Sequence, residues 1–343
     1  MKNKKKVGFA VVGLGAIAQG AVLPAFRHAK RARLVALVSR DKRKAEKLAR
    51  KFGAEAAHSA EEFGACLENP EVAAVYLATP QGEHLSATIA AARAGKHVLC
   101  EKPLAVTSAQ SAEMVRVCEE YGVRLMTAYR KYYEPSALYL KKLIQGGKLG
   151  KIDVINTSFS ELHLPGRSLP WMLDSRMAGG GPLMDLGIYC VNTSRWLVEE
   201  DPVEVSAHAW KKDAERFRDV EEGISFRMQF ASGLLVQGTS TYSSAISSFM
   251  FVQGTKGWAC LTPAFPFDEE RRLTGKSDGK WFEKKFRVVD EFAPELDAFA
   301  AAIQTKKRVA PDGRQGHRDM IILEAIYESA RKKEPVGIKY GIP

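Results

Sequence analysis

The chain has 343 residues, of which 45% are hydrophobic and 27% are charged. This balance is typical of globular proteins and excludes collagen-like, fibrous and disordered classes, while the length suits two domains. No apolar run approaches the roughly 20 residues that cross a bilayer, so we expect no membrane partner. The five cysteines lack paired spacing, which predicts reduced thiols and a cytoplasmic location.

The chain is basic, with 51 Lys and Arg against 40 Asp and Glu, a net charge of +11. The surplus gathers between residues 27 and 51, where eleven basic residues face two acidic ones. Aromatic residues are not interleaved there, so we expect no nucleic-acid partner. A solvated helix face explains Lys47, Arg50 and Lys51, whereas the stretch 40–44 is suited to a small anion.

The first 130 residues alternate short apolar runs with longer amphipathic ones. This rhythm predicts strands joined by helical crossovers, and hence a doubly wound parallel sheet. We therefore expect a Rossmann domain that binds NADP over residues 1–129. The predicted strands are 7–12, 34–38, 72–78, 97–100 and 124–128, and the predicted helices are 16–29, 42–52, 82–94 and 108–121.

A different pattern begins after residue 129 and predicts a substrate-binding and oligomerisation domain over residues 130–343. Alternating segments joined by hairpin-type turns predict a mostly antiparallel open sheet covered by helices on one face, an α+β domain. The other face is free to pair with a second copy, so we expect a homodimer or homotetramer. The predicted strands are 152–160, 203–210, 223–230, 234–242, 248–253 and 258–261, and the predicted helices are 135–145, 186–197, 292–304 and 318–332.

A glycine-rich turn lies between the first predicted strand and helix, where a dinucleotide fingerprint belongs. It reads Gly13-Leu-Gly15-Ala16-Ile17-Ala18, with Ala18 in place of the third glycine. Gly13 permits the tight turn, and Gly15 lets the backbone approach a pyrophosphate at the helix N-terminus. We expect cofactor contacts from Gly13, Gly15, Ala16 and Ile17.

The end of the second predicted strand distinguishes NADP from NAD. An NAD site places an acid there for the ribose 2′-hydroxyl, whereas an NADP site supplies cations for the 2′-phosphate. Here Ser39, Arg40 and Lys44 offer a hydroxyl and two cations, while Asp41 comes late and suits a helix cap. The sequence therefore favours NADP, with NAD as the alternative.

Three further motifs follow in a fixed order: residues 78–84 (ATPQGEH), 95–103 (GKHVLCEKP) and 179–192 (GGGPLMDLGIYCVN). In sequence and order they resemble the glucose–fructose oxidoreductase / inositol dehydrogenase family, and the resemblance covers almost the whole chain. Tyr189 and Asn192 are most similar to the glucose–fructose oxidoreductase branch. The resemblance implies a pyridine-nucleotide oxidoreductase that acts on a sugar or polyol.

The residue chemistry supports that implication. Oxidising a sugar hydroxyl needs a base for the O–H proton, and a tyrosine, whose ordinary pKa is about 10, needs a nearby cation to act as one. The resemblance assigns proton transfer to Tyr189 and the cation to Lys102. It further implies that Asp185 binds substrate or holds Lys102, although Asp185 could equally cap its helix, and that Asn192 orients a sugar hydroxyl.

The resemblance also implies a wider set of contacts. Lys102 and Arg130 follow predicted strands directly, at the edge where ligands of parallel sheets bind, and His84 suits helix packing as well as cofactor binding. No metal site is expected, because the His and Cys residues show no ligand spacing. The expected cofactor contacts are Thr79, Pro80, Gln81, His84, Glu101, Lys102, Arg130 and Trp171, and the expected substrate contacts are Lys102, Arg130, Asp185, Tyr189 and Asn192.

The sequence therefore predicts an NADP-dependent oxidoreductase for an aldose or a keto-sugar. The alternatives are an inositol, anhydro-sugar or sugar-nucleotide dehydrogenase or reductase of the same family, and an NADP sensor without turnover. The chain departs from the family pattern at Gln81, Met172 and Asp174. Because it begins almost at the first strand, we expect neither the leader nor the permanently bound cofactor of the periplasmic glucose–fructose enzyme.

The cations near residue 40 lead to a test. We expect NADPH to bind at least tenfold more tightly than NADH, because only NADPH carries the 2′-phosphate that Arg40 and Lys44 can pair with. Fluorescence titration of both reduced cofactors measures this ratio. Equal affinities would contradict the assignment.

Overall fold

The structure is a computed structural model that describes residues 5–164 and 170–341, and its chain divides into two compact units. Unit 1 comprises residues 5–130 and 290–317, and unit 2 comprises residues 131–289 and 318–341. The chain thus enters unit 1 twice, whereas the sequence predicts a single division after residue 129. The segment that returns carries helix α9 (Phe292–Thr305), whose Phe299 is fully buried against Phe9 of the first strand.

Unit 1 is built on the parallel sheet that the sequence predicts. The strand order is β3-β2-β1-β4-β5-β6, and all five neighbouring pairs are parallel. Strands β1 and β4 are buried along their whole length, as expected for a sheet covered on both faces. The strands are β1 (Val7–Val12), β2 (Ala32–Ser39), β3 (Ala56–Ser59), β4 (Ala74–Leu77), β5 (His97–Glu101) and β6 (Leu125–Ala128).

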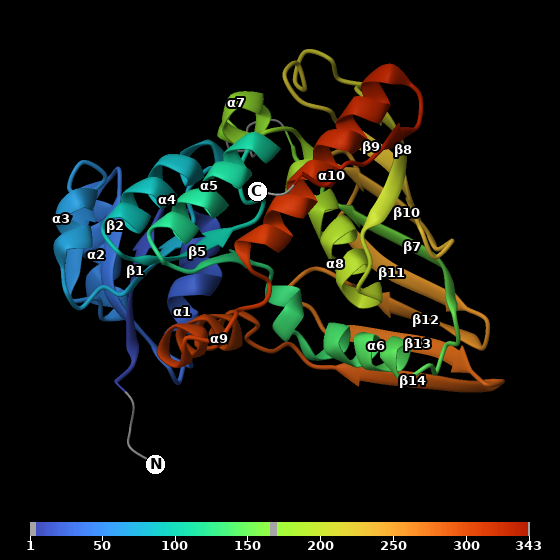
Figure 1. Cartoon of the computed structure of the whole chain (residues 1–343), viewed down its shortest axis with the longest axis horizontal. Coiled ribbons are helices and arrows are strands. Elements are labelled where there is room, and N and C mark those ends of the chain that lie inside the picture. The colour runs from blue at the N-terminus through green and yellow to red at the C-terminus, as the bar shows by residue number, and fades with distance from the viewer. Residues whose placement is uncertain (1–4, 165–169, 342–343) are drawn as a thin grey trace. The chain divides into compact units, whose positions relative to one another are not determined.

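The helices of unit 1 follow the predicted crossovers with two differences. The helix after the glycine turn is continuous from residue 16 to residue 25, with a π-helical turn (Ala18–Val22) before the short α1 (Leu23–Ala25). It ends four residues earlier than predicted, and Pro24 lies in its last turn. Strand β3 and helix α3 were not predicted, because they are short. Figure 1 shows α9 beside α1, in agreement with its contacts. The other helices are α2 (Lys42–Phe52), α3 (Phe63–Glu68), α4 (His84–Arg93) and α5 (Ser108–Glu120).

Unit 2 contains a nine-stranded sheet in the order β14-β13-β12-β11-β7-β10-β9-β8-β15. Every pair is antiparallel except β7 with β10. The two predicted hairpins join β9 to β10 and β11 to β12. The strands are β7 (Ile152–Ser160), β8 (Pro202–Trp210), β9 (Gly223–Phe230), β10 (Leu235–Thr241), β11 (Ser247–Gly254), β12 (Gly257–Thr262), β13 (Arg271–Ser277), β14 (Lys280–Phe286) and β15 (Val336–Gly337).

Helices α6 and α8 pack against the sheet of unit 2, as Figure 1 shows. Helix α10 belongs to this unit from Arg318 onward. No helix among the described residues has both the length and the apolar composition to cross a bilayer. The helices are α6 (Pro135–Gln145), α7 (Ser175–Ala178), α8 (Ile188–Val198) and α10 (Gly313–Lys332).

Candidate active site

The glycine turn of unit 1 has the form that a pyrophosphate requires. Gly13 has φ +89°, and a Cβ atom there would lie 2.6 Å from the carbonyl carbon of Ala78, so only glycine fits between the ends of β1 and β4. Gly15 is exposed, and a Cβ atom on it would meet nothing within 4 Å. The turn therefore presents open backbone at the start of a helical segment, which fits a dinucleotide phosphate.

The acidic and basic residues that follow β2 have different surroundings. Asp41 caps α2, because its Oδ1 accepts a hydrogen bond from the Lys44 backbone nitrogen at 3.1 Å, as the sequence predicts. Its carboxylate is thus engaged by the helix. Arg40 is exposed and Lys44 half-buried, and neither side chain forms an ion pair with any described residue. These cations fit the 2′-phosphate of NADP.

The loop after β4 carries two buried polar atoms without a hydrogen-bond partner among the described residues, and a buried histidine. His84 is fully buried, with its ring nitrogens 3.0 Å from the Thr79 carbonyl oxygen and 3.2 Å from that of Leu104. Burial lowers the pKa of His84, while the contacts with these carbonyl oxygens oppose that change. The ring packs between the loops after β4 and β5, and its contact with the cofactor stays a prediction. Thr79 Oγ1 and Gln81 Oε1 are buried without a hydrogen-bond partner among the described residues, and both fit a nucleotide that would complete them. Pro80 follows Thr79 and is half-buried.

The Glu-Lys-Pro motif ends β5. The Tyr76 hydroxyl donates to Glu101 Oε1 at 2.8 Å, and the Lys102 backbone nitrogen donates to Glu101 Oε2 at 3.2 Å. Burial raises the pKa of Glu101, while the Lys102 ammonium and the Tyr76 hydrogen bond oppose that rise. Glu101 is therefore a fixed hydrogen-bond acceptor beside Lys102.

Arg130, a predicted cofactor and substrate contact, forms a buried ion pair within unit 1. Its side chain is buried, its Nη1 lies 2.5 Å from Glu291 Oε2, and its guanidinium stands over the Phe292 ring at 5.8 Å. Glu291 is fully buried at the start of α9. The pair ties the end of β6 to α9, a structural role that the sequence could not disclose because the partners are 161 positions apart.

Glu295 is a group that the sequence analysis missed. It lies one helical turn after Glu291, is fully buried, and neither of its carboxyl oxygens has a hydrogen-bond partner among the described residues. Burial raises the pKa of Glu295 well above its usual range; the carboxylates of Glu101 and Glu291 add to the rise and Arg130 opposes it. Glu295 is therefore a neutral carboxylic acid beside the charged groups that support Lys102.

In unit 2, the start of α8 is held by a carboxylate from a distant segment. Glu221 accepts hydrogen bonds from the backbone nitrogens of Gly181 and Leu183, both at 2.9 Å, and from the Tyr327 hydroxyl at 2.9 Å. A Cβ atom at Gly181 would lie 2.3 Å from the Glu221 carbonyl oxygen, so the glycine turn is required here. Glu221, not Asp185, satisfies this helix start, so the helix-cap alternative for Asp185 is wrong.

Asp185 lies in a π-helical turn (Leu183–Gly187) that leads into α8, a distortion frequent at functional sites. The Tyr242 hydroxyl donates to its Oδ2 at 3.1 Å, and the Tyr242 ring stacks on His163 with centroids 3.9 Å apart. Burial and Asp185 together raise the pKa of Tyr242 well above its usual range, so this phenol stays a donor. Burial lowers the pKa of His163. Sequence analysis assigned neither Tyr242 nor His163 to the site.

Tyr189 is mostly buried on α8, within an aromatic cluster. Its ring centroid lies 5.7 Å from that of Phe159 and 5.7 Å from that of Phe265, and these contacts restrict its rotation. Neither aromatic neighbour was predicted, since both reach Tyr189 only through the tertiary fold.

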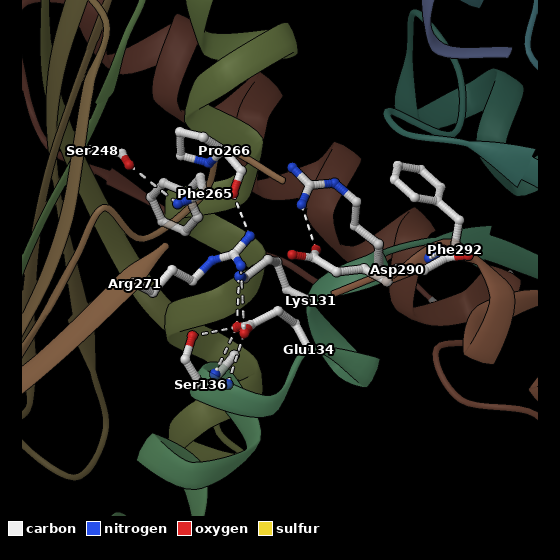
Figure 2. A network of polar contacts seen from close by, with 12 residues as sticks. Lys131, Glu134, Ser136, Ser248, Phe265, Pro266, Arg271, Asp290 and Phe292 are labelled. Carbon is white, nitrogen blue, oxygen red and sulfur yellow. Dashed lines mark hydrogen bonds and ion pairs between the residues drawn. The ribbon is translucent and has the colours of Figure 1, made fainter. Parts of the chain in front are cut away.

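A buried polar network holds Phe265 in place (Figure 2). The Phe265 backbone nitrogen donates to Ser248 Oγ at 3.1 Å, and Arg271 donates to the adjacent Pro266 carbonyl oxygen. The Arg271 guanidinium lies 3.8 Å from the Glu134 carboxylate, which also receives Lys131 at 2.8 Å. The Lys131 and Arg271 cations lower the pKa of Glu134 to about 2, against the effect of its burial. Hydrogen bonds and buried ion pairs thus fix the segment that carries Phe265, whose ring packs against Tyr189.

Asn192 and Trp171, the remaining candidates, lie in different elements of unit 2. Asn192 is buried on α8, and its Nδ2 donates to Asp319 Oδ2 at 2.8 Å. Trp171 lies half-buried in a 3₁₀ turn (Pro170–Leu173), directly after residues outside the described part of the chain. Asp174, a departure from the family pattern, caps α7 through a 2.9 Å bond from the Arg176 backbone nitrogen.

The fold divides the candidates between the two units. Gly13 to Arg130 lie in unit 1, while Trp171, Asp185, Tyr189 and Asn192 lie in unit 2. The Lys102–Tyr189 pairing therefore stays a prediction. Among the described residues, no three His, Cys, Asp or Glu side chains gather as a metal ion would require.

Comparison with known proteins adds independent findings. Residues 7–129 match a family model described as an oxidoreductase family with an NAD-binding Rossmann fold, and residues 137–260 match the GFO/IDH/MocA C-terminal domain. The chain is 32% identical to D-xylose 1-dehydrogenase [NADP(+)] of Haloarcula marismortui, over 97% of this chain and 93% of that protein. It is 31% identical to 1,5-anhydro-D-fructose reductase of Ensifer adhaerens, over 80% and 82% respectively.

A solved structure also resembles this chain along its whole length. The aldose-aldose oxidoreductase from Caulobacter crescentus, crystallised with glycerol, superposes with a TM-score of 0.92 at 33% identity. The match covers 97% of this chain and 100% of that chain.

The neutral state of Glu295 has a consequence for stability. The folded protein keeps a proton that the unfolded chain releases above a pKa of about 4.3, so its free energy of unfolding falls as the pH rises between that value and the raised folded pKa. Glu295→Gln carries no such proton. We expect its stability relative to the wild type to increase with pH, by up to about 1.4 kcal/mol per unit between pH 5 and 7.

Urea unfolding at pH 5, 6 and 7 measures this difference. The control is Glu46→Gln, because Glu46 is exposed on α2, and its effect should stay within about 0.5 kcal/mol at each pH. A Glu295→Gln protein that is less stable than the wild type by the same amount at every pH would show that Glu295 is ionised.

Proposed function

The chain belongs to the GFO/IDH/MocA oxidoreductase family, and we propose that it is an NADP-dependent enzyme that oxidises an aldose at C1 or reduces a keto-sugar. The observation that carries the proposal is the full-length match to an NADP-dependent xylose dehydrogenase and to an aldose-aldose oxidoreductase. A match over both units includes the sugar-binding half of those proteins as well as the nucleotide-binding half.

The cofactor site is proposed in unit 1. The backbone of the Gly13–Ala18 turn would hold the pyrophosphate, and Ser39, Arg40 and Lys44 would hold the 2′-phosphate. Thr79 and Gln81 offer buried oxygen atoms that lack a partner among the described residues. When bound there, NADP supplies hydride transfer to or from the sugar carbon, a chemistry that no side chain provides.

The proton of the sugar hydroxyl would be transferred by a side chain of the protein. During oxidation, the phenolate oxygen of Tyr189 would take the hydroxyl proton of the sugar as the carbonyl forms, and during reduction the phenol would return it. The Lys102 ammonium would stabilise the phenolate and bind the same sugar oxygen. Glu101 accepts a hydrogen bond from the Lys102 backbone nitrogen, and the Phe159 and Phe265 rings pack against Tyr189.

A second substrate class is favoured by a specific relative. The 31% identity to a 1,5-anhydro-D-fructose reductase makes an anhydro-keto-sugar the second candidate, reduced by the same residues. Both substrates are neutral and rich in hydroxyl groups. A spectrophotometric screen of aldoses, keto-sugars and anhydro-sugars with NADP and NADPH separates the candidates, and absence of turnover across the panel would favour a cofactor sensor.

We also propose that the protein works in the cytoplasm as a homodimer or homotetramer. The five cysteines are free thiols, four of them buried, as suits a reducing compartment. On β11, buried Ser248, Met250 and Val252 alternate with the more accessible Phe249 and Phe251, so this strand turns aromatic side chains away from its buried face. Such a face suits contact with a second copy.

The catalytic pair predicts a loss of turnover without loss of fold. Lys102→Met removes the cation and Tyr189→Phe removes the proton carrier, so each should lower kcat for sugar oxidation at least a hundredfold. Circular dichroism and NADPH titration should show a folded, cofactor-binding protein. Lys47→Met and Tyr121→Phe, which change exposed residues of unit 1, are the matched controls and should keep wild-type rates. A near-normal rate in either catalytic variant would overturn its role.

The oligomeric state is tested by light scattering. We expect at least twice the mass of the 37.8 kDa chain at micromolar concentration. Phe249→Glu would place a charge on the accessible face of β11 and should shift the population toward monomer. A monomeric wild-type protein would contradict the proposal.

A further inference from the structure

The face of α8 that carries Tyr189 is held by a single buried carboxylate from α10. Asp319 is fully buried; its Oδ2 accepts a 2.8 Å hydrogen bond from Asn192 Nδ2, and its Oδ1 forms a close ion pair with Arg195. Asn192 follows Tyr189 by three residues, about one helical turn, and Arg195 follows Asn192 by three more. Asp319 therefore binds α8 about one helical turn after Tyr189, the candidate catalytic residue.

This contact determines which end of the Asn192 amide is available. A carboxylate can accept hydrogen bonds but cannot donate one, so it binds the NH₂ group and repels the carbonyl oxygen. Asp319 remains charged because Arg195 pairs with it in the interior. The amide orientation is thus set by chemistry, and Oδ1 is the atom of Asn192 that is directed away from Asp319.

We propose that Asp319 is a positioning residue that makes Asn192 a hydrogen-bond acceptor toward the substrate, and thereby selects neutral sugar hydroxyls against carboxylates. The inference rests on the proposed function and deepens it. A sugar hydroxyl donates to Oδ1, whereas a carboxylate at the same place, as in a uronic acid, would bring two acceptors together and lose the hydrogen bond. The substrate class is then a neutral polyhydroxy sugar, not a sugar acid.

The primary test compares Asp319→Asn with the wild type. The new amide can donate to Asn192, so the Asn192 side chain can turn over and offer its NH₂ group. We expect the KM for a neutral aldose to rise about tenfold, with kcat within threefold because Tyr189 and Lys102 are unchanged. The ratio of kcat/KM for the aldose to that for its uronic acid should fall at least tenfold.

The matched control is Asp201→Asn. Asp201 also pairs with Arg195, through a 2.9 Å bond from Nε, and with Arg318 at 2.9 Å, but it does not contact Asn192. It should leave KM and the selectivity ratio within twofold. Equal effects of Asp201→Asn and Asp319→Asn would mean that the Arg195 ion pairs, not the orientation of Asn192, set substrate binding, and would overturn the proposal.

A double-mutant cycle tests whether Asp319 acts through Asn192. Asn192→Ala should itself raise KM and level the aldose-to-uronate ratio, and adding Asp319→Asn to it should change neither further. Additive effects would contradict the proposal. Should Asp319→Asn fail to fold, Asn192→Ala keeps the Asp319–Arg195 pair and decides alone: an unchanged selectivity ratio would overturn the inference.

A measurement without turnover separates this inference from the proposed function. In ¹⁵N-asparagine-labelled protein, one proton of the Asn192 side-chain amide should resonate downfield, because it is bonded to a carboxylate, and Asp319→Asn should remove that shift. If the wild type turns over no sugar but the shift is present, the positioning of Asn192 stands and the substrate class fails. Absence of the shift in an active wild type overturns the positioning while the proposed function stands.

Discussion

Two carboxylates that are remote in sequence hold helix α8, and the candidate chemistry of unit 2 depends on them. Glu221 binds the backbone at the start of the helical segment, and Asp319 binds Asn192 and Arg195 farther along it. Between these points lies Tyr189, whose ring is further confined by aromatic contacts. Because buried charges are costly unless paired, the pairing leaves α8 few alternative positions. The proposed role of Tyr189 in proton transfer therefore requires no movement of the helix.

Unit 1 also contains buried acidic and basic residues, which gather near the Glu-Lys-Pro motif. Glu291 pairs with Arg130, Glu101 lies beside Lys102, and burial raises the pKa of Glu295 in the same region. The helix that carries Glu291 and Glu295 comes from the last quarter of the chain, so the surroundings of the Glu-Lys-Pro motif are completed only when that segment returns.

The sequence predicted the parallel sheet well, because buried strands such as Val7–Val12 are uniformly apolar and the intervening helices are amphipathic. It missed β13 and β14, where the strand Lys280–Phe286 is mostly exposed and charged. Such a strand is defined by backbone hydrogen bonds to its neighbour, and these leave little trace in hydropathy. The helix expected at 16–29 contains a π-helical turn and ends at residue 25, a local distortion that periodicity does not reveal.

In the candidate site, the sequence predicts the role of a residue best where that role depends on neighbours in the chain. Gly13 and Gly15 at a strand–helix turn, Asp41 as the cap of α2, and the cations near residue 40 all belong to this class. Only the tertiary structure shows that His84 and Arg130 are buried against other parts of unit 1, that Tyr242 binds Asp185, and that Glu295 and Asp319 lie near candidate residues. Their hydrogen-bond partners lie between 5 and 161 positions away, and a buried charge depends for its role on whichever partner the fold brings to it.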